Sequence, residues 1–242
     1  MKRFAIIGLK RTGSSYLVNL LGSHPQIHCC GEIFNRDGVN LRWPKAMGGR
    51  PAGREITSEL KELRARDPQA FLARVLAIDF GKPVLGFKIF HKHNRPMLER
   101  ILEDRAIAKI VHRRENGLAR YASALAARAT GDSGRHAEKP LVEFDAADFA
   151  AFHREHATFF DETERRLAAG GQPFHVSRYE ELNSPSRLKA MLEFLGVTPD
   201  LPPLQEPPPN RASSDILSRF SNPEAAEAYL RDHGLTHWSR EG

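Results

Sequence analysis

The sequence has little cysteine: of its 242 residues only Cys29 and Cys30 are cysteines, and they are adjacent. Neighbouring cysteines are poorly placed for an ordinary disulfide, and no Cys-x-x-Cys pair or His/Cys cluster has the spacing of a zinc site. The sequence also lacks an apolar run long enough to span a membrane. Its first predicted strand begins at Arg3, which leaves no room for a signal peptide. We therefore expect a cytoplasmic protein without disulfides or a bound metal.

The remaining composition is ordinary for a globular protein, with 40% hydrophobic and 27% charged residues. The length allows a full α/β core, so we predict that residues 1–242 form one domain. The net charge of +6 suits an anionic ligand. No recognised motif for reading nucleic acid accompanies this charge, so we do not expect nucleic acid as a partner.

Short apolar runs alternate with helical patterns, which predicts a three-layer α/β fold: a central, mainly parallel sheet flanked by helices, as in phosphate-loop proteins. The predicted strands are residues 3–9, 27–30, 84–90, 108–113 and 174–178. The predicted helices are residues 14–22, 57–66, 68–80, 94–104, 116–130, 146–169, 185–195 and 222–233. Asp67, Ser184 and Asn222 are expected to cap helix starts, and Gly196 to end a helix.

The first strand runs into a turn of glycines and hydroxyl residues, at residues 8–16, that opens a helix. The spacing of Gly8 and Gly13 nearly matches the Walker phosphate loop, but Ser14 stands where that loop has its lysine. A nucleoside triphosphate is therefore a poor candidate ligand. An anion held by the N–H groups of the first helical turn and by hydroxyl groups is a better one. Arg11 adds a permanent cation that can grip an oxyanion through two N–H groups.

Four stretches, in this order, resemble the sulfotransferases that use 3′-phosphoadenosine-5′-phosphosulfate (PAPS), particularly their bacterial and Golgi-like carbohydrate branch. Residues 10–16 resemble the loop for the 5′-phosphosulfate, and residues 109–123 the segment for the 3′-phosphate. Residues 177–182 resemble a strand followed by a Tyr-Glu-Asp-Leu turn, and residues 188–197 the helix after it. The resemblance covers most of the chain. It implies PAPS as donor, 3′-phosphoadenosine-5′-phosphate (PAP) as product, no required metal, and a hydroxyl acceptor on a carbohydrate or glycoconjugate.

The resemblance also assigns residues to the donor. The 5′-phosphosulfate loop is formed by Lys10, Arg11, Thr12, Gly13, Ser14, Ser15 and Tyr16. Arg11 matches the family's catalytic lysine or arginine, and we give it an electrostatic role because a guanidinium does not readily release a proton. The 3′-phosphate is expected on Arg114 and Ser123, with Arg113 as the alternative arginine. The interval from Arg114 to Ser123 is one residue longer than the family usually shows, so the assignment of this pair to the 3′-phosphate stays open.

For the general base the resemblance favours Glu32, because a glutamate at this place acts on the sugar hydroxyl in the carbohydrate branch. Glu32 follows the short predicted strand 27–30, so it should lie beside the phosphate loop. His91 and His93 offer a rival, since histidine titrates near neutral pH and cytosolic members use a histidine at a comparable place. Of the two we prefer His91, which comes just past the predicted strand 84–90. Lys88 is expected to line the acceptor or sulfate site.

Two other functions stay open. A small-molecule or nucleoside kinase would share the fold, but it would need a lysine at position 14 and ligands for magnesium. A non-catalytic protein could keep the nucleotide site for interaction alone. The loops at residues 36–54 and 130–140 are the expected acceptor-recognition segments. We assign no role to the C-terminal segment with Arg211 and Trp238. Whether the protein forms a homo-oligomer stays open.

Overall fold

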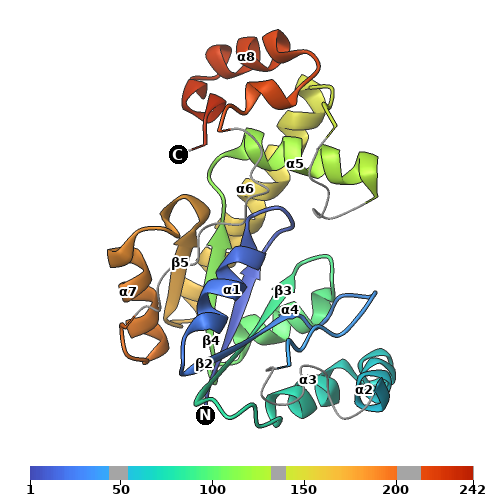
Figure 1. The fold of residues 1–242 in the computed structure, drawn as a ribbon, viewed down its shortest axis with the longest axis vertical. Helices are drawn as coiled ribbons and strands as arrows, with labels where there is room; N and C mark the ends of the chain where they lie inside the picture. The colour runs from blue at the N-terminus through green and yellow to red at the C-terminus, as the bar shows by residue number, and fades with distance from the viewer. Residues whose placement is uncertain (44–53, 132–139, 201–213, 242) are drawn as a thin grey trace.

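The computed structural model describes residues 1–43, 54–131, 140–200 and 214–241. Five parallel strands form its sheet in the order β2-β3-β1-β4-β5 (Figure 1). They are β1 (Lys2–Gly8), β2 (Ile27–Glu32), β3 (Val84–Phe90), β4 (Ile107–Arg113) and β5 (Phe174–Arg178). The predicted α/β fold with a central parallel sheet is confirmed.

The helices follow the predicted order along the chain. They are α1 (Ser14–Ser23), α2 (Arg54–Arg66), α3 (Pro68–Leu76), α4 (Arg95–Glu103), α5 (Gly117–Thr130), α6 (Ala146–Ala169), α7 (Pro185–Leu195) and α8 (Pro223–Asp232). Short 3₁₀ turns are η2 (Tyr179–Glu181), η3 (Leu217–Arg219) and η4 (Thr236–Ser239).

Each face of the sheet packs against its own set of helices, because alternate side chains of a strand point to opposite faces. Phe4 and Ile6 of β1 join a core with α1 and α7. Ala5 and Ile7 of the same strand join a core with α3, α4 and α6. Burial on both faces explains why the strands read as nearly continuous apolar runs.

A third apolar cluster lies beyond the carboxyl edge of the sheet, where α5 and α8 form the upper part of Figure 1. It includes Tyr121 of α5, Phe149 of α6 and Trp238 of η4. The 24-residue α6 also contributes Phe160 to the core that contains Ala5 and Ile7, so this helix belongs to that core and to the third cluster.

Several helix ends differ from the prediction. Helix α3 stops at Leu76 instead of residue 80, and Phe80 stacks on His28 instead. Ser184 and Asn222 make no capping hydrogen bond. The side chain of Asn222 instead binds the backbone of Phe144: its amide oxygen accepts from the Phe144 N–H, and its amide nitrogen donates to the Phe144 carbonyl.

Two helix ends agree with the prediction. The side chain of Asp67 caps α3 by accepting from two N–H groups. Gly196 ends α7 with a left-handed φ of 69°.

Gly86 should be intolerant of a side chain, because a Cβ in the middle of β3 would overlap the buried ring of Phe4. We expect Gly86→Ala to lower the free energy of unfolding by about 1–3 kcal/mol, measured by urea denaturation. Gly22→Ala is the matched control, since nothing lies within 4 Å of its added Cβ and helix α1 favours alanine. Equal effects of the two substitutions would contradict the packing account.

Candidate active site

The loop between β1 and α1 lies at the carboxyl edge of the sheet, where the chain leaves β1 toward β2 on one side and leaves the adjacent β4 toward β5 on the other. Arg11 and Gly13 have left-handed φ values of 69° and 78°. Glycine is required at position 13, because a Cβ there would overlap the ring of Tyr179. The fully buried Thr12 tightens the loop by donating its hydroxyl to the Leu9 carbonyl at 2.9 Å.

His112, at the end of β4, supports this loop and was missed by the sequence analysis. Its Nε2 lies 2.9 Å from the carbonyl oxygen of Thr12, and its Nδ1 lies 3.1 Å from the hydroxyl of Ser177. Burial lowers the pKa of His112 to about 4, so the ring is neutral at pH 7. We assign the proton to Nε2, which donates to Thr12, while Nδ1 accepts from the hydroxyl. The apolar run around His112 indicated a strand and carried no sign of these contacts.

Glu32 and Lys88 face each other beside the loop, from neighbouring strands. A register shift in β2 after Cys29 brings Glu32 opposite Lys88. The Nζ of Lys88, on a side chain 3% exposed, lies 3.1 Å from Oε1 of Glu32. It also donates to the hydroxyls of Ser14 and Ser15, each at 3.2 Å. One ammonium therefore joins the carboxylate to both hydroxyls that begin α1.

His93 and Asn35 lie at the other oxygen of Glu32. The N–H of Phe90 donates to Nδ1 of His93 at 3.3 Å, which leaves the proton on Nε2. That Nε2 lies 3.3 Å from Oε2 of Glu32, and Asn35 donates to the same oxygen at 3.0 Å. Burial raises the pKa of Glu32, but the His93 donor and the Lys88 charge outweigh it and lower the pKa to about 2. The sequence analysis named His91 and His93 together and preferred His91, whereas His93 is the histidine that lies at this place.

His91 lies against α6. Its Nε2 is 3.4 Å from Oε1 of Glu155, and its ring packs beside Phe159. Burial lowers the pKa of His91. Within the described parts of the chain, no hydrogen bond or ion pair joins His91 to Glu32 or to the loop.

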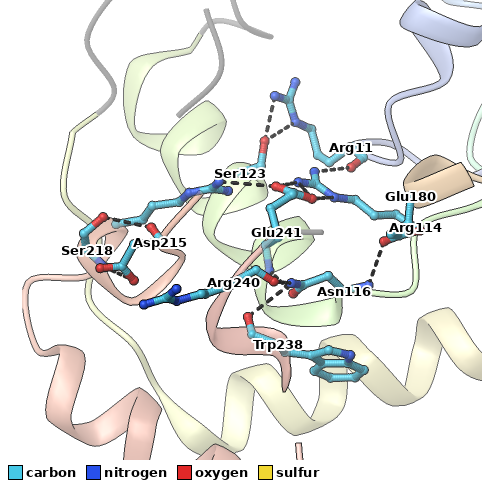
Figure 2. A network of polar contacts seen from close by, with 12 residues as sticks. Arg11, Arg114, Asn116, Ser123, Glu180, Asp215, Ser218, Trp238, Arg240 and Glu241 are labelled. Atoms are coloured by element: carbon cyan, nitrogen blue, oxygen red, sulfur yellow. Dashed lines mark hydrogen bonds and ion pairs between the residues drawn. The ribbon is translucent and has the colours of Figure 1, made fainter. Parts of the chain in front are cut away.

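Arg11 and Arg114 meet on the other side of the loop, near Ser123 of α5 (Figure 2). Arg11 donates through Nε and Nη2 to the Ser123 hydroxyl, at 2.9 and 2.7 Å. The guanidinium of Arg114 lies 4.6 Å from the ring centroid of Tyr179, and its Nη1 is 3.5 Å from the Arg11 carbonyl. Arg114 and Ser123, the two residues expected to bind the 3′-phosphate, therefore both contact Arg11 of the loop.

Arg113 points elsewhere. Its guanidinium pairs with Glu115 at 2.7 Å and with Glu164 of α6 at 3.1 Å. Of the two neighbouring arginines, Arg114 is the one that lies at the loop.

The C-terminal segment brings a carboxylate to Arg114 (Figure 2). Both oxygens of Glu241 bond to the Arg114 guanidinium, and Nη2 of Arg219 lies 3.3 Å from Oε2. The amide of Asn116 fixes this segment by donating to the carbonyls of Trp238 and Arg240, at 3.1 and 2.9 Å. The carboxylate of Glu241 thus binds the guanidinium of Arg114, which the sequence analysis assigned to the 3′-phosphate.

The remaining predicted features are placed as follows. The hydroxyl of Tyr16 donates to Asn183 at 3.0 Å, and Lys10 is exposed. Most of the two predicted acceptor loops, at residues 36–54 and 130–140, and Arg211 lie outside the described residues. Both cysteines are free and buried. In the described ranges no cluster of three or more His, Cys, Asp or Glu could hold a metal, and no helix has the length and apolarity to cross a membrane.

The chain as a whole is similar to known sulfotransferases. A model of the Sulfotransferase family matches residues 4–200. The crystal structure of a sulfotransferase from Alicyclobacillus acidocaldarius is similar over 99% of this chain and 99% of its own, with a TM-score of 0.52 and 18% sequence identity. At this identity the likeness concerns the fold alone. No curated protein matches the chain.

The Glu32 carboxylate should make the free energy of unfolding depend on pH. A carboxyl whose pKa falls from its ordinary 4.5 to about 2 on folding stabilises the folded state above pH 4.5. This contribution, at most about 3 kcal/mol, is lost as the pH falls toward 2. In urea titrations, the stability difference between wild type and Glu32→Gln should therefore shrink as the pH is lowered below 4.5.

Glu162→Gln, at an exposed position on α6, is the control. A difference between wild type and Glu32→Gln that stays constant with pH would contradict the assigned network.

Proposed function

This chain belongs to the sulfotransferase family, and from that premise we propose that it moves the sulfuryl group of PAPS to a hydroxyl of a carbohydrate or glycoconjugate. The observation that carries the proposal is the position of Lys88, whose ammonium touches both the loop hydroxyls and the carboxylate of Glu32. This arrangement puts a cation and a base next to an anion loop. Sulfuryl transfer uses all three parts, because the loop and the cation stabilise charge on the transferring group and the base takes the proton of the acceptor.

The donor-binding groups fit a ligand with two separated anionic ends. The first-turn N–H groups of α1, the hydroxyls of Ser14 and Ser15 and the guanidinium of Arg11 would hold the 5′-phosphosulfate. Arg114 and Ser123 would hold the 3′-phosphate. The grip of Arg114 on the Glu241 carboxylate supports this, because it shows the guanidinium with its fork directed at an oxyanion.

In the reaction, an acceptor hydroxyl attacks the sulfur in line with the bond to the leaving phosphate. The new S–O bond forms as the old one breaks, and PAP departs with the bonding electrons. Arg11 stabilises charge on the leaving phosphate, and Lys88 stabilises charge on the transferring group. Glu32 takes the proton of the hydroxyl. Because two side-chain cations balance the charge, the proposal requires no metal ion.

Lys88 also couples donor binding to the strength of the base. A sulfuryl group at the loop would compete with Glu32 for the Lys88 ammonium, and Glu32 would lose the nearest charge that lowers its pKa. His93 and Asn35 would keep Oε2 in place meanwhile. We therefore assign proton removal to Oε1, the oxygen that Lys88 releases.

Glu32→Gln should cut turnover by about a hundredfold or more, because the amide keeps the shape of the side chain but cannot accept the proton. Turnover would be measured as transfer of labelled sulfur from PAPS in a screen of sugar acceptors. The affinity for PAP should stay nearly unchanged. His91 is the second candidate for the base, so His91→Gln is the matched comparison. Loss of turnover in His91→Gln with full activity in Glu32→Gln would move the role of base to His91.

Glu241→Gln should tighten PAP binding by about fivefold or more, because the 3′-phosphate would no longer displace a carboxylate from Arg114. Arg114→Ala should weaken it by about tenfold or more, since hydrogen bonds to a charged group are lost. Both are read by calorimetric titration. Glu224→Gln, exposed in the first turn of α8, controls for the change in net charge. Unchanged affinity in both variants would place the 3′-phosphate elsewhere.

A further inference from the structure

Arg120 is a buried cation that has no anionic partner among the residues that the structure describes. It lies on α5, one helical turn before Ser123, and is 5% exposed. Its Nη2 is 3.5 Å from the Phe152 carbonyl, its guanidinium lies 4.0 Å from the Phe152 ring centroid, and its Nε has no hydrogen-bonding partner. No carboxylate in the described residues is within ion-pair distance of it.

The charge of Arg120 is nevertheless retained. Burial lowers its pKa to about 9, although the nearby charge of Glu155 opposes this shift. The guanidinium is therefore protonated at pH 7. A buried ion without a counter-ion is destabilising by several kcal/mol, and such groups in native proteins usually have a ligand or a function.

Two histidines of α6 lie in the same region. The rings of His153 and His156 are 6.5 Å apart, and Nδ1 of His153 and Nε2 of His156 are buried without a hydrogen-bonding partner. Burial and the charge of Arg120 lower the pKa of both rings, to about 2 for His156. Each ring is therefore neutral and has one N–H to donate. The region offers hydrogen-bond donors and one positive charge, and the described part of the chain supplies no anionic acceptor for Arg120.

This region adjoins the proposed 3′-phosphate site on one side and the end of the strand that carries Lys88 on the other. Arg120 and Ser123 are neighbours on α5, and Ser123 bonds to Arg11 of the loop. On the α6 side, Glu155 lies next to His91, which directly follows the strand that carries Lys88. The 3′-phosphate is already provided for by Arg114, so Arg120 is available to the other substrate.

We propose that Arg120, assisted by His153 and His156, binds an oxyanion group of the acceptor, either a carboxylate or a sulfate ester. The inference rests on the proposed function and narrows it, because the acceptor would be an acidic saccharide and not a neutral one. The planar guanidinium suits either group, since both present two oxygens to its fork. A neutral sugar would leave the buried charge uncompensated.

The test follows the Nε–H resonance of Arg120 in protein saturated with PAP, assigned by its absence from Arg120→Met. D-Glucuronate is titrated against the matched neutral sugar D-glucose, with inorganic sulfate as a third arm. We expect a saturable shift with glucuronate and none with glucose. In Arg120→Met, glucuronate binding measured by calorimetry should weaken about tenfold or more. Arg128→Gln, an exposed arginine on the same helix, should leave it unchanged.

No movement of the resonance with glucuronate would overturn the proposal, and so would an equal response to glucose. A shift with inorganic sulfate alone would assign the site to a free ion and overturn the acceptor assignment. The wild-type titration decides even if Arg120→Met does not fold. Absence of PAP binding would refute the proposed function instead, and the same titration without PAP would still report on Arg120.

Discussion

The buried ammonium of Lys88 is the contact on which the rest of the site depends. It lies 3.2 Å from the hydroxyls of Ser14 and Ser15 and 3.1 Å from Glu32, so it connects β2, β3 and the start of α1 at one point. Burial lowers the pKa of Lys88, and the carboxylate of Glu32 opposes this shift. Without Glu32 the loop would face an unbalanced cation, and without Lys88 the carboxylate would face the loop without a counter-charge.

A common feature of the site is that its cations bond to the chain's own polar groups. Lys88 pairs with Glu32, Arg114 with Glu241, and Arg11 donates to Ser123. Binding of an anionic donor to such a site is an exchange of partners. The exchange limits affinity, because each new contact replaces an existing one, but it links the arrival of the donor to changes at Glu32 and at the C-terminal segment. Arg120 differs from these cations because the described chain offers it no anion.

The sequence predicted the parts of the site that depend on local pattern. The apolar run before Gly8, the glycine at position 13 and the paired hydroxyls define a phosphate loop without reference to the rest of the chain. Glu32 and Lys88 were proposed through the family resemblance, and the parallel register of β2 and β3 places them together.

The contacts that the sequence did not predict join residues far apart in the chain. His112 was read only as part of a strand, because its bond to Thr12 depends on how β4 lies beside β1. His93 was passed over for His91, since which of two nearby histidines turns toward Glu32 depends on the backbone after β3. Glu241 meets Arg114 only because Asn116 fixes the C-terminal segment over α5. Asn222 has the residue type of a helix cap, and a tertiary contact uses its amide instead.

The central claim is that the loop and its cations bind a 3′-phosphorylated adenine nucleotide without help from a metal. Calorimetric titration of the protein with PAP, in the presence and absence of magnesium and beside a titration with ATP and magnesium, tests it most directly. The account predicts tight binding of PAP that is the same with and without magnesium. Binding of ATP only in the presence of magnesium, with no response to PAP, would contradict it and assign the site to a kinase.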